Sequence, residues 1–279
     1  MVRIKDPVGQ ELFSFFSHDL RLEDCGSGMS RLPDACIDVT VTSPPYNLGI
    51  KYRKYSDKGA REAYLDWSRV WTAQVHRVLK SSGSFFLNIG SAPSNPMLPH
   101  EMVMLLRSSF VLQNVIHWIK AITIEDRNGD VRSYGHFKPI SSRRFLNDAH
   151  EYVLHFTKSG RVELDRLAIG VPYQDKSNIA RWSHTRGSDL RCRGNTWFIP
   201  YETIQSRAKQ RPHPATFPIR LAEWCIKLHG VSRIETMLDP FLGIGNSAIA
   251  ALQCGVPKFI GFEIDEKYLA EARRRISET

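Results

Sequence analysis

Residues 43–47, Ser-Pro-Pro-Tyr-Asn, have the types and spacing of a binding turn for a flat, amine-bearing group. They follow the apolar run at 37–42, which predicts a buried strand, and ligands of parallel sheets bind where strands end. Two consecutive prolines fix the backbone torsion φ, so the carbonyls of Ser43 and Pro44 are held outward as rigid acceptors. Ser43 adds a hydroxyl and Tyr46 a large ring. The pattern favours a planar ligand with an exocyclic amine, and a plain structural turn is the alternative.

Residues 239–247 have the features of a loop that approaches a ligand closely. They read Asp-Pro-Phe-Leu-Gly-Ile-Gly-Asn-Ser and separate a predicted strand from a predicted helix. Two glycines permit close backbone approach, and Asn246 or Ser247 can cap the helix. Glu263 ends the next predicted strand, where an acid commonly holds the hydroxyls of a ribose. Asp239 would repel a pyrophosphate but accept a cationic amino group, which favours S-adenosylmethionine over NAD.

Strands and helices that alternate along the chain must position these two loops. Short apolar or β-branched runs predict buried strands at residues 37–42, 84–89, 235–238 and 259–263. Apolar residues at helical spacing predict helices at residues 62–79, 247–254 and 266–276. The first of these helices is expected to stop at Gly83. This alternation predicts an α/β fold with a mostly parallel, doubly wound sheet and right-handed crossovers.

The stretch 176–211 differs from both ends of the chain. It holds eight Lys and Arg against two acids, with aromatic residues interleaved and little periodicity. Such a segment favours binding to nucleic acid, and a long solvated loop is the alternative. Trp197 and Phe198 are expected to pack it back onto the rest of the chain. The sequence therefore predicts a catalytic and cofactor-binding domain with a target-recognition insert, the domain at residues 1–158 and 212–279 and the insert at residues 159–211.

Composition limits the class of protein and its compartment. With 42% apolar and 24% charged residues over 279 positions, the chain has the balance of a globular protein, which excludes disordered and collagenous chains. Its net charge of +9 favours an anionic partner. Five cysteines without metal-ligand spacing indicate buried thiols, with neither a disulfide framework nor a metal site. No signal core and no membrane-length apolar run occur, so we expect a cytoplasmic protein with no membrane partner.

Taken together, the two loops resemble the motifs of the amino-methylating DNA methyltransferases of the permuted, so-called beta arrangement. In that family the catalytic motif precedes the target-recognition segment and the cofactor motif comes last, as Thr-Ser-Pro-Pro-Tyr-Asn and Asp-Pro-Phe-x-Gly-x-Gly do here. The resemblance implies a Rossmann-like, S-adenosylmethionine-dependent methyltransferase fold in permuted order. It covers nearly the whole chain, because intermediate matches occur at residues 22–25, 32–38, 77–83, 150–156 and 213–218.

The resemblance also implies which residues bind S-adenosylmethionine. Asp239 would take its amino group, Glu263 its ribose and Asp24 its adenine amine. The segment around Thr216 would close over the methionine end. Further expected cofactor contacts are Pro240, Phe241, Gly243, Gly245, Asn246 and Ser247. The family usually has a small hydroxyl residue after the second glycine, whereas this chain has Asn246 there and Ser247 next.

The implied catalytic residues form the first turn, Ser43, Pro44, Pro45 and Tyr46. Ser43 Oγ and the Pro44 carbonyl would accept the hydrogens of an exocyclic amine, which spreads the positive charge that develops on its nitrogen. The methyl group then moves in line from the sulfonium. A base in a duplex cannot reach such a site, so it is flipped out and stacks on Tyr46. Covalent attack is not needed, and no cysteine follows a proline as in cytosine carbon-5 methyltransferases.

The type of target base and the contacts to DNA follow from the same resemblance. Serine at position 43, in place of the commoner aspartate, looks like the pattern of N4-cytosine enzymes, and N6-adenine is the alternative. Basic residues of the insert would contact phosphates, while some arginines read guanine in the major groove. The candidate DNA-binding residues are Lys176, Arg181, Arg186, Arg191, Arg193, Arg207 and Lys209. The expected partner is double-stranded DNA, bound by a monomer or homodimer at the nucleoid.

Three other functions compete with this interpretation. A nicotinamide-dependent oxidoreductase is disfavoured by the acid before the glycines, the missing third glycine and the Ser-Pro-Pro-Tyr turn. A DNA-binding protein with an inactive methyltransferase fold is disfavoured because both motifs are intact. An RNA methyltransferase is the remaining neighbour, which a comparison of DNA and RNA acceptors separates.

Overall fold

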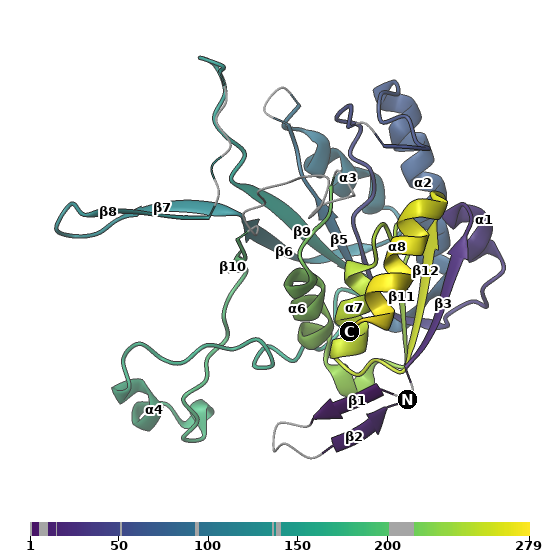
Figure 1. Cartoon of the computed structure of the whole chain (residues 1–279). Helices are drawn as coiled ribbons and strands as arrows, with labels where there is room; N and C mark the ends of the chain where they lie inside the picture. Colours follow the sequence, from purple (N-terminus) through teal and green to yellow (C-terminus); the bar gives the residue numbers. More distant parts are fainter. Residues whose placement is uncertain are drawn as a thin grey trace.

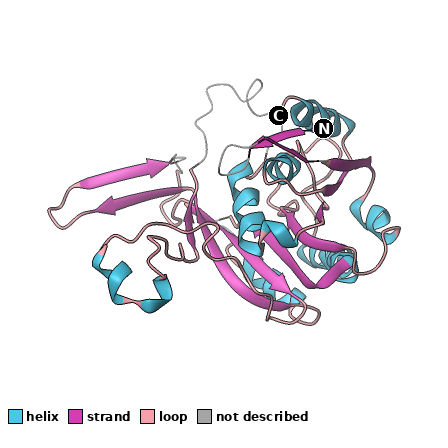
Figure 2. Ribbon diagram, turned by 90° about the horizontal axis from the view of Figure 1, so that it is seen from below, coloured by secondary structure: helices cyan, strands magenta, loops and turns pink. Residues whose placement is uncertain are grey.

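An eight-stranded sheet with helices on both faces forms the body of the protein (Figures 1 and 2). The computed structural model describes residues 2–5, 11–14, 16–50, 52–92, 95–135, 137, 141–200 and 215–279. The strand order is β10-β6-β9-β5-β4-β11-β12-β3. The bounds of these strands are β3 Ser17–Leu22, β4 Ile37–Thr42, β5 Leu79–Ile89, β6 Val111–Ile119, β9 His150–Thr157, β10 Thr196–Phe198, β11 Thr236–Asp239 and β12 Lys258–Glu263.

Most strands of this sheet are parallel to their neighbours. β3, β12, β11, β4 and β5 run in one direction, and β10 is parallel to β6. β9 is antiparallel to both β5 and β6. The predicted α/β class with a mostly parallel sheet is confirmed. Because the carboxyl ends of parallel strands meet at one edge, the loops that follow β3, β4, β11 and β12 lie together.

Two layers of helices cover the sheet, and buried side chains alternate between them. Phe86 of β5 packs with α6, α7 and α8, whereas Phe85 and Leu87 pack with α1, α2 and α3. The alternation arises because successive side chains of a strand point to opposite faces. The bounds of these helices are α1 Cys25–Ser30, α2 Arg61–Val78, α3 Leu98–Leu106, α6 Ile219–His229, α7 Asn246–Gln253 and α8 Glu266–Ser277.

The end of the first long helix differs from the prediction. α2 ends at Val78, and the chain enters β5 at once, because Leu79 already pairs with Ile37 of β4. Gly83 therefore lies inside a strand and does not stop the helix. The predicted strands and the other two predicted helices are present, with ends shifted by one to a few residues.

Two hairpins and three short helical segments complete the described structure. β1 (Val2–Lys5) pairs with β2 (Glu11–Ser14), and β7 (Ala121–Glu125) pairs with β8 (Val131–Gly135). In Figures 1 and 2 the β7–β8 hairpin projects from the body on the same side as α4 (Ser177–Arg181). Single-turn helices occur at η1 (Ser183–Thr185) and η2 (Val231–Arg233).

The predicted insert is joined to the sheet through β10. Trp197 is 1% exposed, and its ring packs against Trp224 of α6 at 5.5 Å, which confirms the predicted packing of this residue. Phe198 differs, because it is 39% exposed and its ring lies beside Tyr134 of β8. Adjacent side chains of a strand point to opposite sides, so both residues cannot enter one core.

Two expectations drawn from composition can be compared with the structure. Cys25 and Cys225 are buried and Cys36 and Cys254 partly buried, whereas Cys192 is exposed in the insert. The expectation of five buried thiols is therefore wrong for Cys192, which lies outside both apolar cores. Within the described part of the chain, no helix is both long and apolar enough to cross a membrane.

A chain of buried polar side chains joins β5, β6, β9 and α6. Ser84 Oγ lies 3.0 Å from His155 Nε2 and 2.9 Å from His229 Nδ1. Asn114 Nδ2 lies 3.0 Å from His155 Nδ1. Burial lowers the pKa of His155 to about 3 and the pKa of His229 to about 4, so both rings are neutral at physiological pH.

We predict that Ser84→Ala lowers the free energy of unfolding by about 2 kcal/mol, because it leaves buried imidazole nitrogens without hydrogen-bond partners. Chemical denaturation at neutral pH measures this change. Ser82→Ala is the matched control, since Ser82 is an exposed serine of the same strand. Equal unfolding free energies for the two variants would contradict the prediction.

Candidate active site

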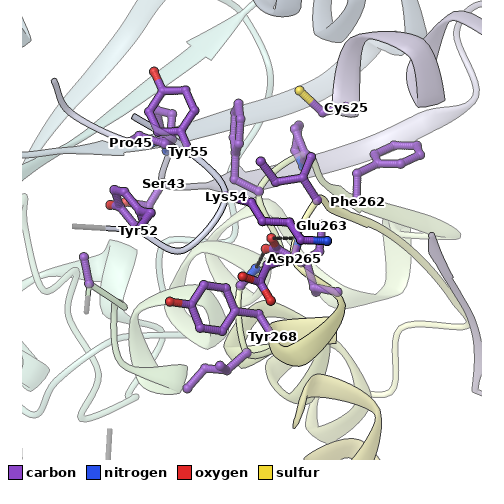
Figure 3. Close-up of a pocket in the computed structure, with 18 of the residues that line it drawn as sticks. Cys25, Ser43, Pro45, Tyr52, Lys54, Tyr55, Phe262, Glu263, Asp265 and Tyr268 are labelled. Carbon is purple, nitrogen blue, oxygen red and sulfur yellow. Dashed lines mark hydrogen bonds between the residues drawn. The ribbon is translucent and has the colours of Figure 1, made fainter. Parts of the chain in front are cut away.

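A pocket opens where the loops after β3, β4, β11 and β12 meet (Figure 3). Its empty volume, including the open solvent at its mouth, is about 1010 Å³. Both predicted loops line it, through Ser43, Pro44 and Pro45 of the first and Pro240, Phe241, Leu242, Gly243, Ile244 and Asn246 of the second. The parallel sheet thus brings two motifs from opposite ends of the chain into one site.

Asp239, the last residue of β11, holds the two loops together. Its carboxylate accepts hydrogen bonds from Thr42 Oγ1 at 2.5 Å, Ser247 Oγ at 2.5 Å and the Phe241 backbone N–H at 3.0 Å. Burial raises the pKa of Asp239 to about 6, while these hydrogen bonds act in the opposite direction. Asp239 is 1% exposed and is not among the residues that line the pocket. The structure therefore shows it as a support of the loop, and its contact with a cofactor stays a prediction.

Gly245 forms the start of α7, which corrects the predicted cap. It adopts a φ of 84°, in the left-handed region, and is itself the N-cap residue. Asn246 and Ser247 are the first residues of the helix, so the prediction that one of them caps it is wrong. Their side chains have other partners, because Asn246 Nδ2 donates to the Phe217 carbonyl and Ser247 Oγ donates to Asp239.

Glu263, the last residue of β12, lies on the pocket wall beside Asp265 and Tyr268 (Figure 3). Its Oε2 accepts from the Gly243 backbone N–H at 2.9 Å, and its Oε1 accepts from the Asp265 backbone N–H at 2.8 Å. Burial raises the pKa of Glu263 to about 7, although the backbone donors lower it. Backbone amides thus hold both oxygens of Glu263 in place at the edge of the pocket, and its contact with a ribose stays a prediction.

The other predicted cofactor residues reach the same pocket. Asp24 lines it and caps α1, because its Oδ1 accepts from the Ser27 backbone N–H at 3.1 Å. Thr216 lines it from the segment that leads into α6. Several lining residues outside the motifs were not predicted, namely Tyr52, Lys54, Tyr55, Trp67 and Tyr268. The aromatic and basic run directly after the Ser-Pro-Pro-Tyr-Asn turn is the signal that could have indicated the first three.

That run is held over the pocket by buried acids. Asp57 is 1% exposed, and its carboxylate accepts from the backbone N–H groups of Asn47, Leu48 and Ile50 at 2.7 to 3.0 Å. Tyr64 OH donates to the Pro45 carbonyl at 2.8 Å. These bonds fix the catalytic turn and the segment after it before any ligand arrives.

Ser43 is joined to a polar cluster at the edge of the sheet. Tyr46 OH lies 2.8 Å from Ser43 Oγ and 3.0 Å from Glu151 Oε2. Asn88 Nδ2 donates to Tyr46 OH at 2.8 Å and to Glu151 Oε2 at 2.9 Å, and Lys120 Nζ donates to Glu151 Oε1 at 3.0 Å. No role was predicted for Asn88, for Lys120 or for Glu151 within the match at 150–156, because only the antiparallel pairing of β9 with β5 and β6 brings them together.

The predicted DNA-binding residues of the insert fall into two groups. Arg181, Arg186 and Arg191 are exposed, and Lys176 is exposed beside Asp189, with which it forms an ion pair. Arg193 has a structural role, because its guanidinium lies 4.2 Å from the centre of the Trp224 ring and its Nε donates to the Ile169 carbonyl at 2.8 Å. Arg207 and Lys209 lie outside the described residues.

Comparisons with known proteins agree with this geometry. The DNA methylase family of N6 and N4 type matches residues 37–274. A protein named type II methyltransferase M.ScaI, from Streptomyces caespitosus, is 27% identical over 261 residues, which cover 89% of this chain and 77% of that protein. A protein named DNA adenine methyltransferase YhdJ, from Escherichia coli, is 23% identical over 259 residues, which cover 91% of this chain and 80% of that protein.

Solved structures share the fold over almost the whole chain. One titled PvuII DNA methyltransferase, cytosine-N4-specific, superposes with a TM-score of 0.67 at 19% identity and covers 94% of this chain and 87% of its own. The putative DNA modification methylase TTHA0409 of Thermus thermophilus, solved in complex with S-adenosyl-L-methionine, superposes with a TM-score of 0.60 at 22% identity. The superposition covers 94% of this chain and 93% of that one. The family match spans most of the sequence, so the chain belongs to the DNA methylase family of N6 and N4 type.

Proposed function

We propose that this DNA methylase transfers a methyl group from S-adenosylmethionine to the exocyclic N4 amine of a cytosine flipped out of double-stranded DNA. The observation that carries the proposal is the position of Ser43, at the end of β4 and on the wall of the pocket that Glu263 also lines. A hydroxyl acceptor for an amine and an acid for a ribose thus share one cavity. Serine at this position matches the pattern expected of N4-cytosine enzymes, and the likeness to a structure titled cytosine-N4-specific supports it.

The residues around the pocket divide the work between cofactor and base. Glu263 and Asp24 hold the ribose and the adenine of the cofactor. Asp239 fixes the glycine loop and is the proposed partner of the amino group. S-adenosylmethionine supplies an electrophilic methyl group on its sulfonium. Ser43 Oγ and the Pro44 carbonyl accept the hydrogens of the target amine and hold its nitrogen in line with that methyl group.

The insert supplies the grip on DNA in this proposal. Exposed Arg181, Arg186 and Arg191 contact phosphates or base edges, whereas Arg193 supports the insert on Trp224. Relatives are named type II methyltransferases, which supports a role in a restriction-modification system. The enzyme then acts in the cytoplasm, on the DNA of the nucleoid.

N6-adenine is the second candidate target. A relative that covers most of the chain is named a DNA adenine methyltransferase, and the exocyclic amine of adenine is conjugated to its ring as that of cytosine is. Ser43 and the Pro44 carbonyl suit either amine, so only the product decides.

The function is tested by identifying the methylated base. The purified protein is incubated with S-adenosylmethionine and unmethylated DNA, and the DNA is digested to nucleosides for mass spectrometry. We expect N4-methylcytosine. N6-methyladenine would replace the proposed base specificity with the second candidate. In a parallel reaction with RNA, methylation of the RNA but not of the DNA would overturn the choice of nucleic acid.

Ser43→Ala tests the role of the serine hydroxyl. We expect the methylation rate at saturating cofactor to fall by about 100-fold, because one preorganised partner of the reacting amine is lost. The affinity for S-adenosylmethionine, measured by calorimetry, should stay the same. A variant that methylates DNA at the wild-type rate would remove this role from Ser43.

Cofactor affinity should depend on pH through Glu263. Its pKa is raised by burial to about 7, and only the ionised carboxylate is a full acceptor for ribose hydroxyls, so affinity for S-adenosylmethionine should fall several-fold as the pH drops below 7. Calorimetric titrations on both sides of pH 7 measure this. Glu263→Gln should bind more weakly and lose this pH dependence, and an equal dependence in the variant would assign it to another group such as Asp239.

A further inference from the structure

The hydrogen bonds around Ser43 have one consistent direction. Lys120 lies 3.0 Å from Glu151 Oε1 and stabilises Glu151 as a carboxylate, which can only accept hydrogen bonds. Tyr46 has a single hydroxyl proton, which it donates to the charged Glu151 Oε2 at 3.0 Å in preference to the neutral backbone carbonyl of Asn88 at 3.3 Å. In the contact of 2.8 Å between Ser43 and Tyr46, Ser43 must therefore be the donor. Asn88 Nδ2 lies 3.4 Å from Ser43 Oγ, and the second lone pair of this oxygen can accept from a ligand.

Asn88 strengthens this direction. Its Nδ2 lies 2.9 Å from Glu151 Oε2 and 2.8 Å from Tyr46 OH, so the amide nitrogen faces the carboxylate. The reverse orientation would set the amide oxygen against the carboxylate oxygen, which is repulsive. The tyrosine oxygen therefore receives hydrogen bonds from both Asn88 and Ser43, and its own proton is left for Glu151.

We propose that Glu151 is the final proton acceptor of the methylation reaction and acts through Tyr46 and Ser43. The inference rests on the proposed function, because it needs an exocyclic amine at Ser43. Glu151 is not among the residues that line the pocket, so it is a positioning and proton-accepting residue behind the catalytic serine.

The proton transfers balance the reaction. The nitrogen lone pair forms the new C–N bond as the C–S bond breaks, which leaves neutral S-adenosylhomocysteine and a positively charged nitrogen with one surplus proton. Ser43 Oγ takes that proton and passes its own to Tyr46, which passes its own to Glu151 Oε2. The products are the neutral methylated amine and a protonated Glu151, which later releases its proton to solvent. A protonated, conjugated amine is a far stronger acid than a carboxylic acid, so even an ion-paired carboxylate accepts this proton.

The sheet explains why this carboxylate reaches the site. Glu151 is near the start of β9, which runs antiparallel to β5, so it lies at the same edge of the sheet as the end of β4. Gly90 leaves the space that the cluster fills, because a Cβ there would lie 3.0 Å from Glu151 Cγ and 3.1 Å from Tyr46 Cε2. The side chain of Glu151 is 12% exposed and that of Lys120 is 16% exposed, so both are largely shielded from water.

Other charged and titratable groups surround Glu151 and must be considered in any pH profile. Lys120 at the end of β6 and Tyr46 of the catalytic turn contact it directly. His150, the first residue of β9, and Asp148, which precedes the strand, both interact with the charge of Glu151. Tyr52 of the pocket lining also interacts with it. Burial raises the pKa of Asp148 and lowers the pKa of His150.

The test uses single-turnover methylation of DNA by the full chain, at saturating S-adenosylmethionine, over a range of pH. Glu151→Gln keeps the shape of the side chain but removes the proton acceptor, so we expect the rate to fall by about 100-fold, as for loss of a general base. Tyr46→Phe keeps the ring and breaks the chain, so a similar loss is expected. The double variant should be no slower than the slower single variant, because both act in one pathway.

The pH profile separates a proton acceptor from a structural residue. The wild-type rate should fall at low pH, whereas the low rate of Glu151→Gln should not change over that range. Glu223→Gln is the control, because Glu223 pairs with Lys227 on α6, away from the pocket, and should keep the wild-type profile. Calorimetry with S-adenosylmethionine confirms that each variant is folded and binds cofactor, and Tyr46→Phe carries the test alone if Glu151→Gln does not fold.

The outcomes separate this proposal from the function on which it rests. If the wild-type protein methylates no DNA, the proposed function fails and the relay falls with it. If the product is N6-methyladenine, the relay still applies, because that amine loses the same proton. Wild-type DNA methylation together with an unimpaired Glu151→Gln variant, or additive losses in the double variant, would overturn the relay alone.

Discussion

The site depends on the hydrogen bonds that the buried carboxylate of Asp239 accepts. It joins the end of β11 to the end of β4 through Thr42 and to the start of α7 through Ser247. A carboxylate that is 1% exposed must have its oxygens paired, since an unpaired buried charge is very unfavourable. Separating the two loops would break these hydrogen bonds and leave the carboxylate without partners. The loops therefore stay together, and the pocket between them is formed before a ligand binds.

Two other carboxylates fix loops of the site in the same way. Glu263 closes β12 with both oxygens on backbone amides, and Asp57 gathers the amides of the segment after the catalytic turn. In each case a carboxylate organises backbone that would otherwise be irregular. The sheet sets the direction of these loops, and the acids fix the backbone of the loops that line the pocket.

The sequence predicted those parts of the molecule whose cause is local. Strands at 37–42 and 259–263 follow from runs of buried side chains, and the loop at Gly245 follows from the need for positive φ. The helix cap and the stop at Gly83 were wrong because strand pairing and loop closure override local preference at element ends. Ser43 and Glu263 both line the pocket, and their roles there stay predictions.

Other features depend on pairing between distant segments and could not be predicted locally. β10 is three residues long and forms only because β6 offers it an edge. Glu151 reaches Tyr46 only through the antiparallel register of β9, in which Tyr152 pairs with Ile89. The β7–β8 hairpin has exposed apolar residues on both strands, so it lacks the pattern of a half-buried sheet.

The pairing of β10 with β6 also has an evolutionary consequence. Within the described residues, the insert begins after β9 and meets the sheet again at β10, where Trp197 anchors it against Trp224 of α6. Residues ahead of this strand can diverge in length and sequence while the sheet stays unchanged. A chimeric enzyme that exchanges this region for that of a relative must therefore retain a strand that fits the edge of β6, together with an aromatic anchor for α6.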